Sequence, residues 1–173
     1  MGHSASLKTS IIPVKVISIV GHSGSGKTTL IEKLLPVLNS AGLKVATIKH
    51  THHHVSFDTP GKDSWRLKQA GAMASMLVTP HALQLVADYA EQHDPVLLAQ
   101  RYFSDADLVL AESFSQANCP QIEVLRGACA TTPRGVGLIA LVTDVESAYP
   151  QLPHFSLHDV DGIAKFILGR ARG

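Results

Sequence analysis

Glycines, a lysine and two threonines near the start of the chain are spaced in a pattern that suits phosphate binding. The segment reads GHSGSGKT and fits G-x-x-x-x-G-K-[ST]. Glycines let the backbone turn tightly, so that successive N–H groups point at phosphate oxygens. The lysine can reach the β- and γ-phosphates, and the threonine hydroxyl can bind Mg²⁺. We therefore expect a nucleoside triphosphate to contact Gly21, His22, Ser23, Gly24, Ser25, Gly26, Lys27, Thr28 and Thr29. A glycine-rich turn without a ligand is the alternative.

An acidic residue ends a second apolar segment, Asp107–Glu112 (DLVLAE). If that strand lies beside the phosphate site, Glu112 can hold Mg²⁺ through water or orient an attacking water. The alternative is a strand-end acid that faces solvent. We predict Lys27 and Glu112 as the catalytic pair, and Thr28, Asp58 and Glu112 as the metal contacts. Asp63 contacts the metal or simply caps a helix.

Four histidines fall within five residues: His50, His52, His53 and His54. Alternate residues of an extended segment point the same way, so His50, His52 and His54 can share one face. Three interpretations stay open: a transition-metal site, a contact with a nucleotide or substrate phosphate, and a solvated polar loop. Lys49 and Lys62 favour the contact with an anion, so we predict Lys49, His50, His52 and Lys62 as ligand-binding residues.

Composition narrows the class of protein. The 15 Lys and Arg residues nearly balance the 14 Asp and Glu residues, for a net charge of +1. No basic stripe indicates a nucleic acid or an anionic membrane as the main partner. No apolar run approaches the roughly 18 residues of a membrane span. Cys119 and Cys129 are expected to be reduced thiols in a cytoplasmic protein.

The alternation of apolar segments with helical patterns predicts an α/β protein with a P-loop NTPase-like, mostly parallel sheet flanked by helices and a projecting β-hairpin. Residues 1–12 are expected to be a flexible tail, and residues 13–173 a single domain. The expected strands are Val14–Val20, Leu43–Ile48, Asp107–Ala111, Ile122–Leu125 and Leu138–Val142, with a hairpin of Met73–Val78 and Leu83–Asp88. The expected helices are Lys27–Ser40, with a kink or a weakened turn at Pro36, then Asp63–Ala70, Pro95–Tyr102 and Val160–Leu168, the last with Asp159 as its candidate cap.

Several of these segments together resemble the MobB family, the molybdopterin-guanine dinucleotide biosynthesis adaptor proteins. The resemblance runs from about Val14 to Leu168. Its motifs are the P-loop with Thr28-Thr29, the KHTHH run at 49–53, Asp58, the PGKDS run at 60–64, Ala70-Gly71-Ala72, Asp107–Glu112 with Phe114, and Thr143-Asp144. The two runs are more specific than the P-loop, which many families share.

The resemblance implies a GTP-binding protein that assists the attachment of GMP to molybdopterin. A separate MobA-type guanylyltransferase would catalyse the transfer, and this chain would be a homodimer with weak GTPase activity. Asp144 would accept hydrogen bonds from guanine, although a turn or capping role is the alternative. Ser113 departs from the glycine that the family usually has there, which puts the local backbone path in question.

The sequence leaves two other functions open. A small-molecule P-loop kinase should have a lid with several arginines, and the arginines of this chain do not cluster in that way. A GTPase that delivers a metal would use the histidine run as its metal site. The apolar arms of the predicted hairpin favour a partner that buries them, and we expect that partner to be a second copy of the chain.

Overall fold

The computed structural model describes residues 14–53, 55–56, 58–89, 93–127, 135–145 and 149–172. The chain forms two compact units, one of residues 51–92 and the other of the rest of the chain. The single domain predicted for residues 13–173 contains both units, and the predicted tail lies outside the described residues. No helix among the described residues is long and apolar enough to cross a membrane.

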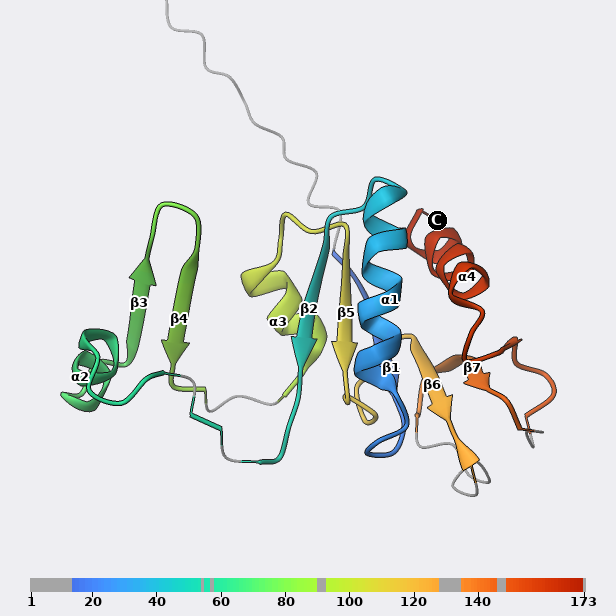
Figure 1. Cartoon of the computed structure of the whole chain (residues 1–173), viewed down its shortest axis with the longest axis horizontal. Helices are drawn as coiled ribbons and strands as arrows, with labels where there is room; N and C mark the ends of the chain where they lie inside the picture. The colour runs from blue at the N-terminus through green and yellow to red at the C-terminus, as the bar shows by residue number, and fades with distance from the viewer. Residues whose placement is uncertain are drawn as a thin grey trace, which may run out of the picture. The chain divides into compact units, whose positions relative to one another are not determined.

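The larger unit is built on a parallel sheet (Figure 1). Its strands are β1 (Lys15–Val20), β2 (Val45–Lys49), β5 (Leu108–Glu112), β6 (Gln121–Leu125), β7 (Leu138–Thr143) and β8 (His154–Phe155). They lie in the order β2-β5-β1-β6-β7-β8, and every neighbouring pair is parallel. The predicted parallel sheet is confirmed. The sequence missed β8 because two residues are too few to show strand alternation.

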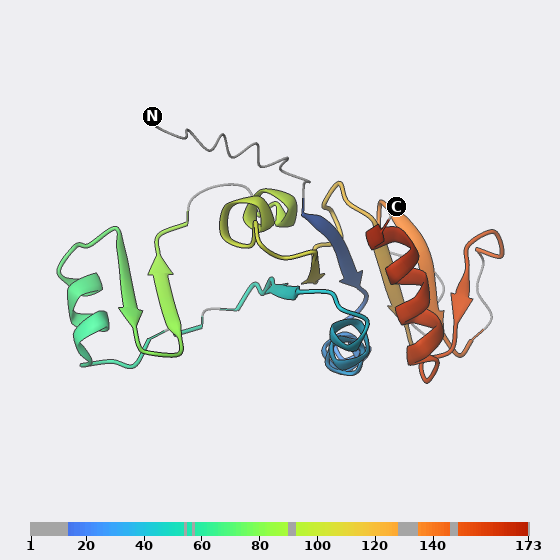
Figure 2. The ribbon, with the colours of Figure 1, turned by 90° about the horizontal axis from the view of Figure 1, so that it is seen from above.

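Helices cover both faces of this sheet (Figure 2). On one face, α1 (Lys27–Ser40) and α4 (Val160–Arg172) pack on the strands. Leu30, Ile31, Leu34 and Leu38 of α1 are buried there because they recur at helical spacing. On the other face, Ala99 of α3 (Pro95–Tyr102) packs against β1 and β5. Burial on both faces explains why the central strands are apolar throughout.

Glycines set both ends of α1, the helix that begins within the predicted phosphate-binding segment. Gly26 precedes the helix with a φ of 98°, and Gly42 follows it with a φ of 88°. The N–H of Leu43 donates to the carbonyl of Leu38, as in a Schellman motif. The helix runs unbroken through Pro36, where the sequence predicted a kink or a weakened turn. Helix α4 begins as predicted, because the N–H of Gly162 donates to the Asp159 carboxylate.

The smaller unit contains α2 (Asp63–Gln69) and an antiparallel hairpin of β3 (Ala74–Val78) and β4 (Leu83–Ala87). The hairpin confirms the prediction. Thr79 closes its turn, because its N–H and its hydroxyl both donate to the carbonyl of Ala82 and its hydroxyl accepts from the Ala82 N–H. Lys62 precedes α2 and Asp63 is its first residue, so the alternative role of Asp63 as the cap is wrong. The hairpin exposes large apolar side chains, which are Met73, Met76, Leu77, Val78, Leu83 and Leu85.

Candidate functional site

The glycines of the Gly21–Thr28 loop sit in backbone conformations that a side chain would disturb. Gly21 has a φ of 137° and Gly24 a φ of 74°. A Cβ atom at position 21 would collide with the carbonyl oxygen of Val124 on the neighbouring strand β6. The loop is therefore folded tightly at the end of β1, as the phosphate-binding pattern requires.

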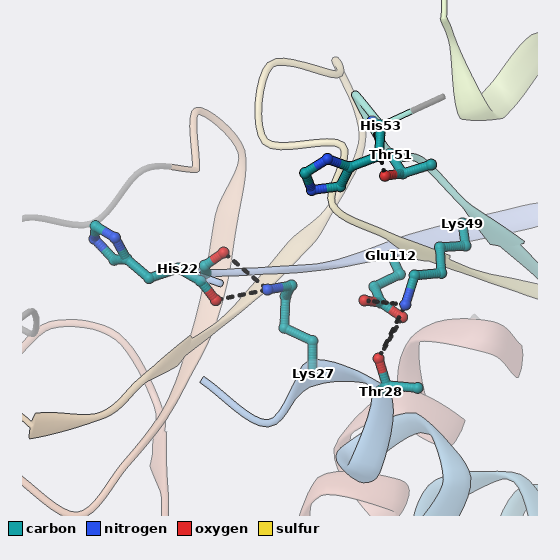
Figure 3. Close-up of polar contacts among 8 residues, drawn as sticks. His22, Lys27, Thr28, Lys49, Thr51, His53 and Glu112 are labelled. Carbon is teal, nitrogen blue, oxygen red and sulfur yellow. Dashed lines mark hydrogen bonds and ion pairs between the residues drawn. The ribbon is translucent and has the colours of Figure 1, made fainter. Parts of the chain in front are cut away.

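Lys27 turns its side chain back into this loop (Figure 3). Its Nζ donates to the carbonyl oxygens of Gly21, at 3.1 Å, and His22, at 2.7 Å. The residue is only 7% exposed, so its charge is held inside the loop. The hydroxyl of Ser25 is buried and has no hydrogen-bond partner among the described residues. A cradle with an enclosed cation and a spare hydroxyl suits the oxygens of an anionic group.

Thr28 and Glu112 meet beside the loop, although they come from different elements. Strand β5 pairs with β1 so that Glu112 lies opposite Ile19, just before the loop begins. The Thr28 hydroxyl donates to Oε2 of Glu112 at 2.9 Å. A hydroxyl and a carboxylate are hard oxygen donors that fit Mg²⁺, which usually takes one or two protein ligands and completes its shell with water and phosphate. The residues present therefore fit the metal that the sequence implied.

Lys49 completes this group of polar side chains. Strand β2 also pairs with β5, and Lys49 lies directly opposite Glu112 in the register. Its Nζ is 3.1 Å from Oε1 of Glu112 and donates to the Thr28 hydroxyl at 3.3 Å. The parallel strands β1, β2 and β5 thus bring Thr28, Lys49 and Glu112 to one edge of the sheet.

The segment after Glu112 is held in an unusual backbone conformation. Ser113 has a φ of 74°, and it is the one non-glycine residue with positive φ in the described part of the chain. Its N–H donates to the carbonyl of Ile19, which ties it to β1. The buried Gln121 amide donates to three carbonyls further along this segment, those of Phe114, Ser115 and Ala117. The chain keeps the glycine-type backbone path despite the serine.

Sequence reasoning missed Arg126 as a site residue. It follows β6 directly and lines two small cavities next to the loop, of about 190 Å³ and 90 Å³. The larger is lined also by His22, Ser23, Gly24 and Ser25, and the smaller by Thr29, Lys33, Leu157 and His158 among others. In the sequence, Arg126 stands at the carboxyl end of a predicted strand. That position indicates a site residue only once the strand, β6, is known to pair with β1.

Asp144 lies at the end of β7, on the same edge of the sheet. Its Oδ1 accepts hydrogen bonds from the N–H of Leu157, at 3.1 Å, and from the hydroxyl of Ser156, at 3.0 Å. These bonds, led by the one from Leu157, lower the pKa of the carboxyl below its ordinary value. Asp144 therefore supports a turn, as the alternative interpretation held, while its guanine contact stays a prediction.

The described histidines of the run, His50, His52 and His53, do not form a metal site. His50 packs its ring against His93, with centroids 4.9 Å apart, and against Phe114, at 5.3 Å. His54 lies outside the described residues. No three His, Cys, Asp or Glu side chains cluster to hold a metal among the residues that the structure describes.

Three other predicted site residues belong to the smaller unit, so they are described apart from the loop. They are His52, Asp58 and Lys62. Asp58 accepts a hydrogen bond from the N–H of Thr59 through Oδ1. Its Oδ2 is buried without a hydrogen-bond partner in the described residues. A role for these three residues in ligand or metal binding stays a prediction.

Comparisons with known proteins agree on one family. The family model described as molybdopterin guanine dinucleotide synthesis protein B matches residues 16–144. The chain is 32% identical over 161 residues to the molybdopterin-guanine dinucleotide biosynthesis adapter protein of Escherichia coli, covering 90% of this chain and 92% of the relative. It is 40% identical over 110 residues to the adapter protein of Haemophilus influenzae, covering 63% of this chain and 62% of the relative.

Solved structures give the same result. The crystal structure of a molybdopterin-guanine biosynthesis protein B superposes with a TM-score of 0.72 at 32% identity, covering 91% of this chain and 99% of the other. The crystal structure of Bacillus subtilis MobB superposes with a TM-score of 0.73 at 28% identity, covering 90% and 97%. The matched segment of the family model includes the loop, Lys49, Glu112 and Asp144.

Proposed function

Because the chain belongs to the MobB family of molybdopterin-guanine dinucleotide biosynthesis adapter proteins, we propose that it binds GTP with Mg²⁺ and assists a separate, MobA-type guanylyltransferase in guanylating molybdopterin. The observation that carries the proposal is the enclosed Lys27 ammonium beside the paired oxygens of Thr28 and Glu112. A site with these groups is suited to a triphosphate and its metal ion.

The loop residues have separate tasks in this proposal. The backbone N–H groups of the loop and the start of α1 would hold the phosphates, and Lys27 would move from the loop carbonyls to the β- and γ-phosphates. Thr28 and Glu112 would hold Mg²⁺, which supplies charge neutralisation at the phosphates. Arg126 would lie along the remaining part of the nucleotide, because it lines both cavities beside the loop.

Selection of guanine is proposed to depend on Asp144. A carboxylate can accept two hydrogen bonds from the N1–H and the exocyclic amine of guanine, a pair of donors that adenine lacks. Ser156 and Leu157 both donate to Oδ1, so they hold this carboxylate in a fixed orientation at the sheet edge. Fixed orientation favours discrimination between bases because a misplaced acceptor gains little.

Hydrolysis is expected to be weak. In the proposed site Glu112 would hold Mg²⁺ together with Thr28, so its carboxylate would not be free to orient an attacking water. We therefore propose a mainly adapter role, in which the protein presents GTP and molybdopterin to the transferase in the cytoplasm, where GTP is available. Lys49, His50, His52 and Lys62 are the proposed contacts with the anionic groups of these ligands.

A homodimer is part of the proposal. Both arms of the hairpin expose large apolar side chains, such as Val78 at 68% and Leu83 at 67%. A two-stranded sheet is marginal by itself in water, and a second copy would bury these side chains.

Nucleotide binding is tested by Lys27→Ala. Removal of the enclosed ammonium should lower Mg²⁺-GTP affinity by about 10- to 100-fold, since a charge-assisted phosphate contact contributes roughly 1.5–3 kcal/mol. Isothermal titration calorimetry measures the loss, and Lys44→Ala, which changes an exposed lysine just before β2, is the matched control. Equal affinities for Lys27→Ala and the wild type would refute the site.

The adapter role is tested by reconstitution. The transferase, molybdopterin loaded with molybdate, and limiting GTP are combined with and without this protein, and the guanine dinucleotide formed is measured by chromatography. We expect faster product formation with the wild type and no stimulation with Lys27→Ala. Equal rates with and without the wild-type protein would refute the adapter role for this chain.

A further inference from the structure

We propose that the Lys49 ammonium is a resident cation of the metal site, which Mg²⁺ must displace, and that the displaced ammonium then binds the terminal phosphate of the nucleotide. Lys49 would thereby make metal binding conditional on a triphosphate and favour GTP over GDP. The part that concerns the phosphate rests on the proposed function, whereas the part that concerns the metal does not.

The first argument is where the ammonium lies (Figure 3). Thr28 and Glu112 hydrogen-bond each other at 2.9 Å, and both contact Lys49 Nζ, at 3.3 Å and 3.1 Å. The three groups form a closed triangle. The two side chains that best suit a hard cation are therefore already engaged by a positive charge supplied by the chain itself.

An ammonium and Mg²⁺ cannot share this position. Mg²⁺ requires oxygen ligands at roughly 2.0–2.1 Å in octahedral geometry, so an ion bound to Thr28 and Glu112 would touch the nitrogen that contacts both. The two cations would also repel each other at that range. In addition, the Thr28 hydroxyl accepts a hydrogen bond from Lys49 Nζ, so the ammonium occupies one of the two lone pairs that the hydroxyl can offer to a metal.

The partner that can move is Lys49. Its side chain is 58% exposed, whereas the Glu112 side chain is 10% exposed and fixed among packed strands. Four rotatable methylenes let the ammonium swing without a change in the backbone, which is held in register opposite Glu112. The metal site can thus open by movement of one flexible side chain.

The γ-phosphate of a triphosphate would compensate Lys49 for the loss of its ion pair with Glu112. With Mg²⁺ held by Thr28 and Glu112, the γ-phosphate of a bound triphosphate would bring new negative charge next to Lys49. The displaced ammonium can bind that charge. A diphosphate lacks the γ-phosphate, so displacement of Lys49 from Glu112 is poorly compensated and the affinity is lower.

The metal part is tested without any nucleotide. Free Mn²⁺, a spectroscopic substitute for Mg²⁺, is titrated into wild type, Lys49→Met and the control Lys44→Met, and unbound Mn²⁺ is measured by electron paramagnetic resonance. Removal of one competing unit charge should tighten Mn²⁺ binding by about tenfold in Lys49→Met, and the control should match the wild type. Equal Mn²⁺ affinity in Lys49→Met and wild type would overturn the proposal. Lys49→Gln provides a second variant if the methionine variant folds poorly by circular dichroism.

The phosphate part is tested by the ratio of GTP to GDP affinity in the presence of Mg²⁺. Wild type should prefer GTP, and Lys49→Met should lose about tenfold of that preference, mainly through weaker GTP binding. An unchanged ratio would overturn the phosphate role. Failure of wild type to bind either nucleotide would instead refute the proposed function, while the Mn²⁺ comparison would still decide the role of Lys49 at the metal position.

Discussion

At the scale of single residues, the site depends on a few side chains and backbone angles, each of which can be tested by a single substitution. Lys27 is enclosed by carbonyls, Glu112 is paired, and Ser113 holds a positive φ directly after it. A left-handed residue with a side chain costs of order 1 kcal/mol or more, so the position after Glu112 stores strain next to the candidate metal ligand.

Ser113→Gly should therefore stabilise the protein. Glycine adopts positive φ without a Cβ clash, and the relief should exceed the extra chain entropy that glycine loses, for a net gain of about 0.5–1 kcal/mol. Urea unfolding followed by circular dichroism measures the free energy of unfolding. Ser113→Val is the opposite control, because a β-branched residue tolerates positive φ worst. A lower stability for Ser113→Gly than for wild type would contradict the claim that the backbone at Ser113 is strained.

Cys119 gives a prediction for pH. Burial raises the pKa of its thiol from 9.0 to about 11, with a further contribution from the charge of Asp94, while a backbone bond from Ser18 opposes the rise. The folded state then keeps the proton that the unfolded state releases, so stability is present below pH 9 and is lost as pH rises towards 11. The difference in urea midpoint between wild type and Cys119→Ala should shrink over that range. A difference that does not change with pH would refute the raised pKa.

At the scale of elements, the ends of helices and strands position the site. Helix α1 begins at Lys27, and the N–H groups of its first turn add a positive end where phosphates are expected. Helices α1 and α4 pack on each other and on the same face of the sheet, so the cap of α4 also supports the face that carries α1.

Asp159→Ala should destabilise the protein by about 1 kcal/mol, because the Gly162 N–H at the start of α4 loses its carboxylate acceptor. Thermal unfolding measures the change. Asp105→Ala is a matched control, since Asp105 is exposed in the connection before β5 and has no cap bond. An equal effect of the two variants would show that the cap contributes nothing.

At the scale of the whole molecule, the two units differ in how well they bury their apolar residues. The larger unit has a core that covers both faces of a parallel sheet, whereas the hairpin of the smaller unit leaves apolar side chains exposed on its strands. An exposed apolar surface of this kind is typical of an interface, which is the basis for the proposed homodimer.

Val78→Glu should weaken this dimer. A charge on the hairpin, at a position directly opposite Leu83, would have to be buried on association, and this should raise the dissociation constant by at least about tenfold. Sedimentation velocity across micromolar concentrations gives the mass. Leu97→Glu, which charges an exposed apolar residue of α3, serves as the control. A monomeric wild type, or a Val78→Glu variant that dimerises as well as wild type, would exclude the hairpin as the interface.

Local sequence determined most of the elements of this protein. Helices Lys27–Ser40 and Pro95–Tyr102 were predicted with the bounds that the structure has, because periodic apolar residues and end signals depend only on neighbours in the chain. The tight turn after β1 and the place of Glu112 at the end of β5 could be predicted for the same reason. The backbone turn needs glycines at fixed positions, and an acid at the end of an apolar strand is visible without a fold.

Tertiary structure decided which side chains meet. No local pattern specifies that β5 lies between β1 and β2, and this order is what places Lys49 opposite Glu112 and Glu112 beside Thr28. The same applies to Arg126, which lies beside the loop only because β6 adjoins β1. Strand order arises from the packing of α1, α3 and α4 on the two faces of the sheet, a property of the assembled core that spacing along the chain does not carry.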